Sequence, residues 1–154
     1  MRDQAVPGAG SLFVALSSDG QILAGGSWDG KVRLRRTSDA ALVRTLPENL
    51  GDIPVAIFSP DGRTLALGDY NGDVRLGQIA DGSLDEIFQG DKKEVSSLAY
   101  SPDGQLLAAG SADGMIRLFQ VANGNLAQVL NHSARVTAIA YSPDGRFLAS
   151  GAYD

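Results

Sequence analysis

The sequence lacks cysteine and contains a single histidine, His132. Without cysteine there is neither a disulfide framework nor a thiolate zinc site, and one histidine cannot supply the usual ligand sets of zinc. A nucleophilic triad is equally poorly supplied, because nothing marks Ser133 beside His132 as activated. We therefore expect a protein that is not an enzyme and that holds no metal or other cofactor.

Long apolar runs and an excess of positive charge are missing as well. No apolar run approaches the roughly 20 residues that a membrane span requires. The chain has 13 Lys and Arg against 18 Asp and Glu, a formal charge of −5 with no basic cluster, which disfavours a nucleic-acid surface. The absence of cysteine and of a signal peptide fits a reducing compartment. We expect a cytoplasmic protein with no nucleic-acid or membrane partner.

Glycine, in contrast, is abundant. The chain has 19 glycines in 154 residues, and they fall beside predicted turns rather than in one linker. Apolar residues make up 44% of the sequence, enough for one domain with a sizeable core. This composition is typical of an all-β protein with many short connections.

Two turn motifs repeat along the chain with the same step. The first motif has glycines that lie 42, 42 and 41 residues apart, and it occurs at Ser17-Ser18-Asp19-Gly20, Ser59-Pro60-Asp61-Gly62, Ser101-Pro102-Asp103-Gly104 and Ser142-Pro143-Asp144-Gly145. The second motif, a hairpin signal, occurs at Asp29-Gly30, Asn71-Gly72 and Asp113-Gly114, and Asp154 stands at its fourth place. A period near 42 residues predicts blades of four antiparallel strands.

Each period accommodates four strands, which we call a to d in chain order. The predicted a strands cover residues 11–16, 53–58, 95–100 and 136–141, and the b strands cover 21–26, 63–68, 105–110 and 146–151. The c strands cover 31–36, 73–78 and 115–120, and the weaker d strands cover 41–46, 84–89 and 126–131. The prediction amounts to three and a half blades.

With these motifs the chain resembles the WD-repeat β-propeller family. The resemblance rests on the Ser-Pro-Asp-Gly turn, the Ser-x-Asp-Gly hairpin and the Val/Ile-Arg-Leu c strand, all in phase. It implies an N-terminal extension, 1–10, and a propeller segment, 11–154, with repeats at about 11–52, 53–94, 95–135 and a truncated 136–154. It also implies an incomplete ring, because propellers of this family typically close with about seven blades.

Three explanations of the half blade stay open. The chain is a piece of a longer propeller, or it completes a ring as a homodimer, or it forms an open arc capped by something else. Two copies would supply about 28 strands, as many as seven four-stranded blades contain. Two a–b halves, however, do not make an ordinary blade.

The resemblance also implies a structural hydrogen-bond network within a blade. In the family this network joins a histidine, a serine or threonine of strand b, the hairpin aspartate and a tryptophan of strand c. Three of its members coincide only in the last repeat, as His132, Ser150 and Asp154.

By resemblance we expect a non-catalytic scaffold or sensor module that binds a protein or peptide. The candidate contact residues precede the hairpin aspartate in each repeat, where Trp28, Tyr70 and Tyr153 are aromatic and Ala112 is not. Aromatic side chains on rigid turns are good anchors, although they can equally cover a neighbouring blade. The alternative function is a propeller enzyme or small-ligand binder with a site in the central channel.

The other repeated charges have structural explanations. The aspartates of the two motifs sit where turn chemistry favours aspartate. Arg33, Arg75 and Arg117 form an in-phase row whose stems we expect to pack while their guanidinium groups pair with turn carboxylates. A basic stripe for an anionic partner is the competing interpretation of this row.

Overall fold

A computed structural model describes residues 11–46, 52–88 and 93–153. The strands of the first two sheets are β1 (Ser11–Leu16), β2 (Ile22–Ser27), β3 (Val32–Arg36), β4 (Leu42–Thr45), β5 (Val55–Phe58), β6 (Thr64–Gly68), β7 (Val74–Gln78) and β8 (Leu84–Phe88). Those of the last two sheets are β9 (Val95–Tyr100), β10 (Leu106–Ser111), β11 (Met115–Gln120), β12 (Leu126–Asn131), β13 (Val136–Tyr141) and β14 (Leu148–Ala152).

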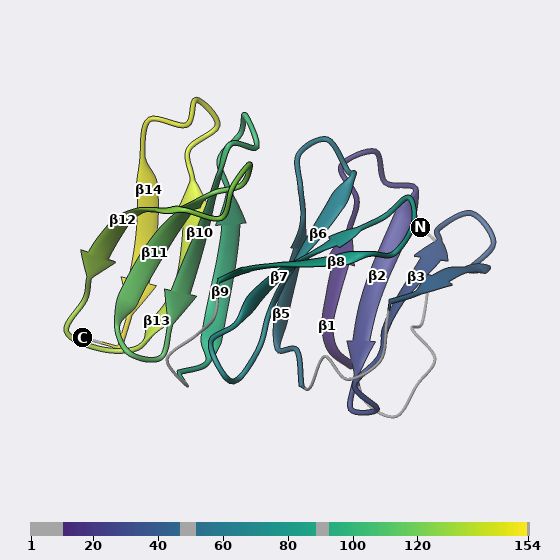
Figure 1. Cartoon of the computed structure of the whole chain (residues 1–154), viewed down its shortest axis with the longest axis horizontal. Coiled ribbons are helices and arrows are strands. Elements are labelled where there is room, and N and C mark those ends of the chain that lie inside the picture. The colour runs from purple at the N-terminus through teal and green to yellow at the C-terminus, as the bar shows by residue number, and fades with distance from the viewer. Residues whose placement is uncertain (1–10, 47–51, 89–92, 154) are drawn as a thin grey trace.

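Within each sheet the strands pair antiparallel, each with the next in the chain. They form three four-stranded sheets, β1 to β4, β5 to β8 and β9 to β12, and a two-stranded sheet, β13–β14. The sheets stand side by side (Figure 1), and their a strands β1, β5, β9 and β13 contact one another in sequence. This arrangement confirms the predicted fold class, an incomplete β-propeller of three and a half blades.

The a–b turns follow directly from their Ser-x-Asp-Gly sequence. In the second sheet Gly62 N donates to Ser59 O over 2.9 Å, and Gly62 takes the left-handed φ of 69° that glycine tolerates best. The hydroxyl of Ser59 donates to Asp61 Oδ1 over 2.6 Å and accepts from the amide of Thr64 over 3.0 Å. The same residues thus close the turn and start strand b.

The b–c turns have a related geometry. Gly30 has a φ of 71°, and its amide donates to Ser27 O over 3.0 Å. Ala40 is the one described residue other than glycine with a positive φ, so Asp29 does not adopt the left-handed conformation. The hairpin is therefore a type I turn followed by a left-handed glycine, not a two-residue primed turn.

Several strands begin one or two residues later than the sequence predicts. The amides of Gln21, Lys31 and Arg63 donate to the side chains of Asp19, Asp29 and Asp61 at 3.0–3.1 Å, which holds these residues in the turn. Strand β5 begins at Val55 instead of residue 53, because Pro54 has no amide hydrogen for the ladder.

The core lies between neighbouring sheets, in three clusters of buried apolar side chains. A glycine of strand b makes room for the next sheet. A Cβ on Gly68 would lie 2.6 Å from Val95 Cγ1, and one on Gly110 would lie 2.7 Å from Val136 Cγ1. Adjacent sheets thus approach so closely that these positions leave no space for a side chain.

Candidate functional site

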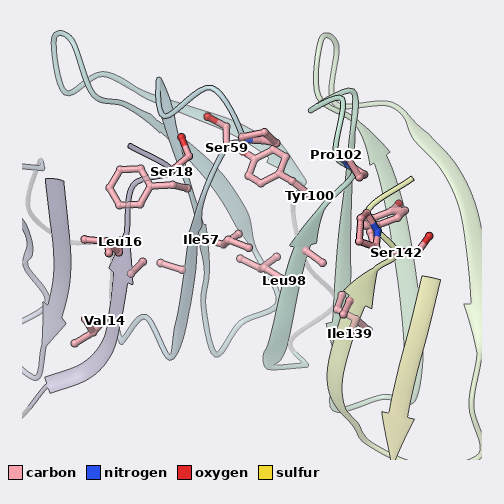
Figure 2. Close-up of a pocket in the computed structure, with 18 residues that line it drawn as sticks. Val14, Leu16, Ser18, Ile57, Ser59, Leu98, Tyr100, Pro102, Ile139 and Ser142 are labelled. Atoms are coloured by element: carbon pink, nitrogen blue, oxygen red, sulfur yellow. The ribbon is translucent and has the colours of Figure 1, made fainter. Parts of the chain in front are cut away.

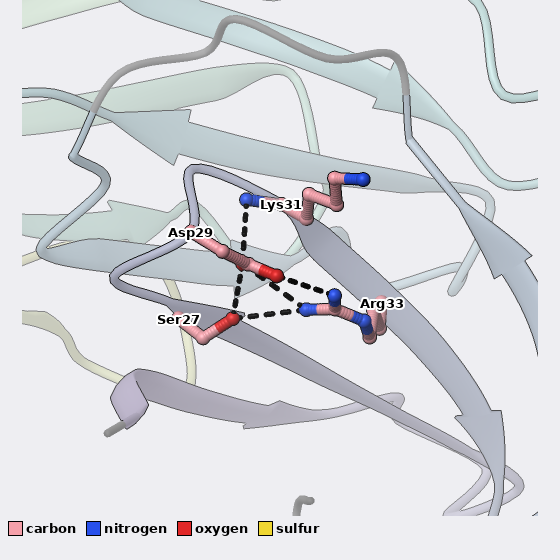
Figure 3. A network of polar contacts seen from close by, with 4 residues as sticks. All are labelled: Ser27, Asp29, Lys31 and Arg33. Carbon is pink, nitrogen blue, oxygen red and sulfur yellow. Dashed lines mark hydrogen bonds and ion pairs between the residues drawn. The ribbon is translucent and has the colours of Figure 1, made fainter. Parts of the chain in front are cut away.

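The b–c turns hold the arginines of the c strands (Figure 3). In the first sheet the guanidinium of Arg33 bonds both carboxylate oxygens of Asp29 and donates to Ser27 Oγ over 2.9 Å. The hydroxyl of Ser27 also donates to Asp29, and the amide of Lys31 donates to the same carboxylate over 3.1 Å. The pKa of Asp29 is lowered, chiefly by Arg33 and then by Ser27.

The second and third sheets repeat this ion pair with different residues. Arg117 Nη2 lies 2.7 Å from Asp113 Oδ2 in the third sheet. In the second sheet Arg75 lies 3.0 Å from both Asp69 and Asp73, because the hairpin there has Asp69 and Asn71 in place of serine and aspartate. The predicted pairing of the arginine row with turn carboxylates is confirmed. These carboxylates already bind the guanidinium groups that an anionic partner would need.

Two candidate contact residues, Trp28 and Tyr70, lie on the same turns, and Tyr153 directly follows β14 at the equivalent place. Trp28 is 60% exposed, Tyr70 44% and Tyr153 77%. Ala112, at the equivalent place in the third sheet, is half-buried. Three sheets therefore each present one large aromatic side chain at the end of the molecule where the b–c turns lie, which we call the b–c end.

The residues of the predicted network lie as follows. His132 Nε2 is 2.7 Å from Ser150 Oγ, so the structure brings these two side chains together. The backbone amide of His132 also donates to Gly114 O over 2.7 Å, which ties the loop after β12 to the b–c turn of the third sheet. Asp154 lies outside the described residues.

A cavity of about 540 Å³ opens along the inner face of the sheets, where a central channel would lie (Figure 2). All four a strands and the turns that follow them contribute to its lining, which includes Leu16, Ile57, Leu98, Tyr100 and Ile139. Among the described residues that line it there is no carboxylate, imidazole or amine. This surface can offer apolar contact and hydroxyl hydrogen bonds.

Two tyrosines of this cavity are not equivalent. The hydroxyl of Tyr100 lies 3.3 Å from Thr64 Oγ1 of the preceding sheet, and burial raises the pKa of Tyr100 to about 12. The hydroxyl of Tyr141 is buried and makes no hydrogen bond to a described residue. Leu106 occupies in the third sheet the place that Thr64 occupies in the second.

The repeat motif decides the family. The model of the family described as "WD domain, G-beta repeat" matches residues 9–35, 82–120 and 124–154, together more than half of the chain. The chain belongs to the WD40 repeat family. WD40 repeats generally mediate protein–protein interaction, and most members of the family are non-catalytic scaffolds. No curated protein matches the chain.

The described residues between the first two matched ranges, 36–46 and 52–81, still build regular structure. They contain β4, β5, β6 and β7, and the b–c hairpin there has Asp69 and Asn71 in place of serine and aspartate. The described part of the chain has no helix that could cross a membrane.

Sequence reasoning missed one group of surface residues. The sequence pattern assigns the a–b turn aspartates to turn chemistry, and the hydrogen bonds of Asp61 confirm this. The pattern was not used to predict which turns lie at the same end of the molecule. In an antiparallel blade the a–b and c–d turns lie at the end opposite the b–c turns. Sorting the turns by end would have identified Asp61, Asp85 and Asp103 as neighbours.

Proposed function

We propose that this WD40 segment is a non-catalytic scaffold or sensor module that binds a protein or peptide at its b–c end. Trp28, Tyr70 and Tyr153 are the residues that contact the partner. The proposal assigns this role to residues 11–154 as one propeller segment that acts in the cytoplasm, and it gives the pair His132 and Ser150, with Asp154, a structural role only.

The exposure of the three aromatic side chains, two of them on rigid turns, carries the proposal. The turns of Trp28 and Tyr70 are held by arginine–carboxylate pairs, so these side chains lose little conformational freedom on binding. The same pairs neutralise much of the local charge. Such a surface suits an apolar or aromatic segment of a partner, because Trp and Tyr dominate the binding energy of protein interfaces.

The experiment begins by identifying the partner, with a photo-crosslinking amino acid at position 28 or 70. The affinity of that partner is then measured by calorimetry for Trp28→Ala, Tyr70→Ala and Tyr153→Ala. We expect a loss of about tenfold or more for at least two of them, the size of an interface hot spot. Phe147→Ala is the matched control, since Phe147 is an aromatic residue that is 68% exposed and follows an a–b turn. Unchanged affinity in all three variants would refute the proposal.

A homodimer that completes the propeller is a second candidate. The exposed apolar side chains of β1, Val14 and Leu16, together with the exposed β13–β14 pair, support it. Light scattering at micromolar concentration tests it. We expect a mass of two chains, and a monomer would contradict it.

A ligand site in the central channel is the alternative from another class. The cavity of about 540 Å³ supports it, and its lining favours an apolar ligand over a reaction. Leu16→Arg, at a lining residue that is 56% exposed, would abolish binding at that site and leave binding at the b–c end unchanged.

A further inference from the structure

The two ends of the molecule differ in how their carboxylates are held. At the b–c end, Asp29, Asp69 and Asp113 each bond an arginine. At the a–b end, Asp61 and Asp103 accept from a serine hydroxyl at 2.6 Å and from a backbone amide at 3.0 Å. These bonds lower the pKa of both groups and add no positive charge. Arg63, which follows Asp61, has its Nε 4.0 Å from that carboxylate and is 85% exposed. The ion pair of Arg36 with Asp39 at this end belongs to the c–d turn of the first sheet.

A groove crosses this end at the junction of the second and third sheets. It consists of two cavities of about 420 and 410 Å³ that share Thr64 and Val121 in their linings. The first cavity lies between the a–b turns of the two sheets, and the second extends to Asp85 on β8. The groove therefore runs from the inner strand of the second sheet to its outer edge.

The lining combines an apolar floor with carboxylates at both ends. Leu76 and Val121 contribute apolar surface, Asp61 and Asp103 stand at the inner end, and Asp85 stands at the outer end. The described lining contains no lysine or arginine. Three strand spacings separate β5 from β8, about 14 Å, which equals about four residues of extended chain.

We propose that this groove binds an extended segment of a partner protein that carries two basic side chains four residues apart. One cation pairs with Asp61 and Asp103, the other pairs with Asp85, and the residues between them lie on Val121 and Leu76. The site goes beyond the proposed function, because it uses the opposite end of the molecule and none of the three aromatic residues.

The test uses the whole chain and a Lys-Ala-Val-Ala-Lys-amide peptide that carries fluorescein on its N-terminal amine, with fluorescence polarisation as the readout at low and physiological salt. We expect about a threefold loss of affinity for Asp103→Asn or Asp85→Asn, and more than tenfold when Asp61, Asp85 and Asp103 are all changed to asparagine. Asparagine keeps the oxygen that accepts the turn hydrogen bonds. Asp19→Asn is the matched control, because Asp19 has the same turn bonds and lies outside the groove.

Two results would overturn the proposal. In the first, the triple variant binds the peptide as the parent does, or Asp19→Asn weakens binding as much as Asp103→Asn. In the second, an isomer with adjacent lysines, Lys-Lys-Ala-Val-Ala, binds as tightly as the spaced peptide, which would reduce the effect to general charge attraction. Trp28→Ala serves as a cross-check, since it should leave the affinity for the spaced peptide unchanged whatever its effect at the b–c end.

Discussion

The third sheet and the β13–β14 pair have closely similar sequences and very different surroundings. Strand β10 reads Leu-Leu-Ala-Ala-Gly-Ser and is buried along nearly its whole length, with Leu107 fully buried. Strand β14 reads Leu-Ala-Ser-Gly-Ala, and its three central residues are exposed. The difference lies in the neighbours, because β10 is paired on both sides and covered by the next sheet whereas β14 pairs with β13 alone. Burial in a propeller is therefore decided between repeats, not within one.

The turns of these two regions are, in contrast, the same. Ser101 and Ser142 each donate to the following aspartate over 2.6 Å, and Gly104 and Gly145 both have a φ of 72°. Local structure thus forms in the half blade as completely as in the full one. Each prediction below changes equivalent residues in the two regions.

Removal of a core leucine should have the largest effect. Leu107→Ala should lower the free energy of unfolding by about 2–5 kcal/mol, because it leaves a cavity among side chains that cannot collapse onto it. Leu148→Ala, at the equivalent position of the half-buried strand, should cost less than half as much. Urea denaturation of both variants gives the two values. Equal losses would mean that β14 is covered in solution, as the homodimer requires.

Addition of one methyl group should also destabilise the third sheet more than the β13–β14 pair. Gly110→Ala should cost about 1–3 kcal/mol, since its Cβ would lie 2.7 Å from the β-branched Val136 and neither strand can move freely. Gly151→Ala is the matched control, because its nearest neighbour, Thr137 Oγ1, is 3.7 Å away. The midpoint of thermal unfolding should fall for the first variant and stay within a degree or two for the second. A comparable fall for Gly151→Ala would contradict the packing explanation.

The two regions also show which structural features can be predicted from the sequence. The turn motifs predict the repeat, the strand order and the arginine–carboxylate pairs, because turns, hairpins and these ion pairs form between residues of the same repeat. The contact of Gly110 with Val136 joins neighbouring repeats, and no sequence motif predicts it. Likewise Ala40 adopts a φ of 59° where the other c–d turns have Gly82 and Gly124, which the sequence around it does not indicate.

The candidate sites follow the same division. Trp28, Tyr70 and Tyr153 could be proposed from their place in the repeat, and their exposure came from the structure. The order of the turns places the carboxylates of the groove at one end of the molecule, but the groove itself could not be predicted, because its cavities lie between two sheets. Such a site depends on the angle between sheets, which packing sets.

Two tyrosine hydroxyls provide a smaller test of the sheet junctions. Tyr100→Phe should cost about 0.5–1.5 kcal/mol, the net value of a hydrogen bond such as the one to Thr64. Tyr141→Phe should be neutral or stabilising, since it removes a buried hydroxyl that has no described partner. Leu106→Thr, with Leu106→Val as its isosteric control, should give the Tyr141 hydroxyl a partner and make Tyr141→Phe cost about as much as Tyr100→Phe. If both Tyr→Phe changes cost the same in urea denaturation, the Tyr141 hydroxyl has a partner in solution.

The smallest effect concerns the turn aspartates, where the two regions should agree. Serine and backbone hydrogen bonds lower the pKa of both Asp103 and Asp144. A folded-state pKa below the unfolded value of about 3.9 stabilises the fold above that pH, and the stabilisation is lost as the pH falls through the folded pKa. Carboxyl ¹³C NMR titration should therefore find both groups lowered, and Ser101→Ala and Ser142→Ala should each raise the pKa of the neighbouring aspartate. A lowered pKa at Asp103 alone would show that these turns need a complete blade, whereas equal shifts would show that they form within one repeat.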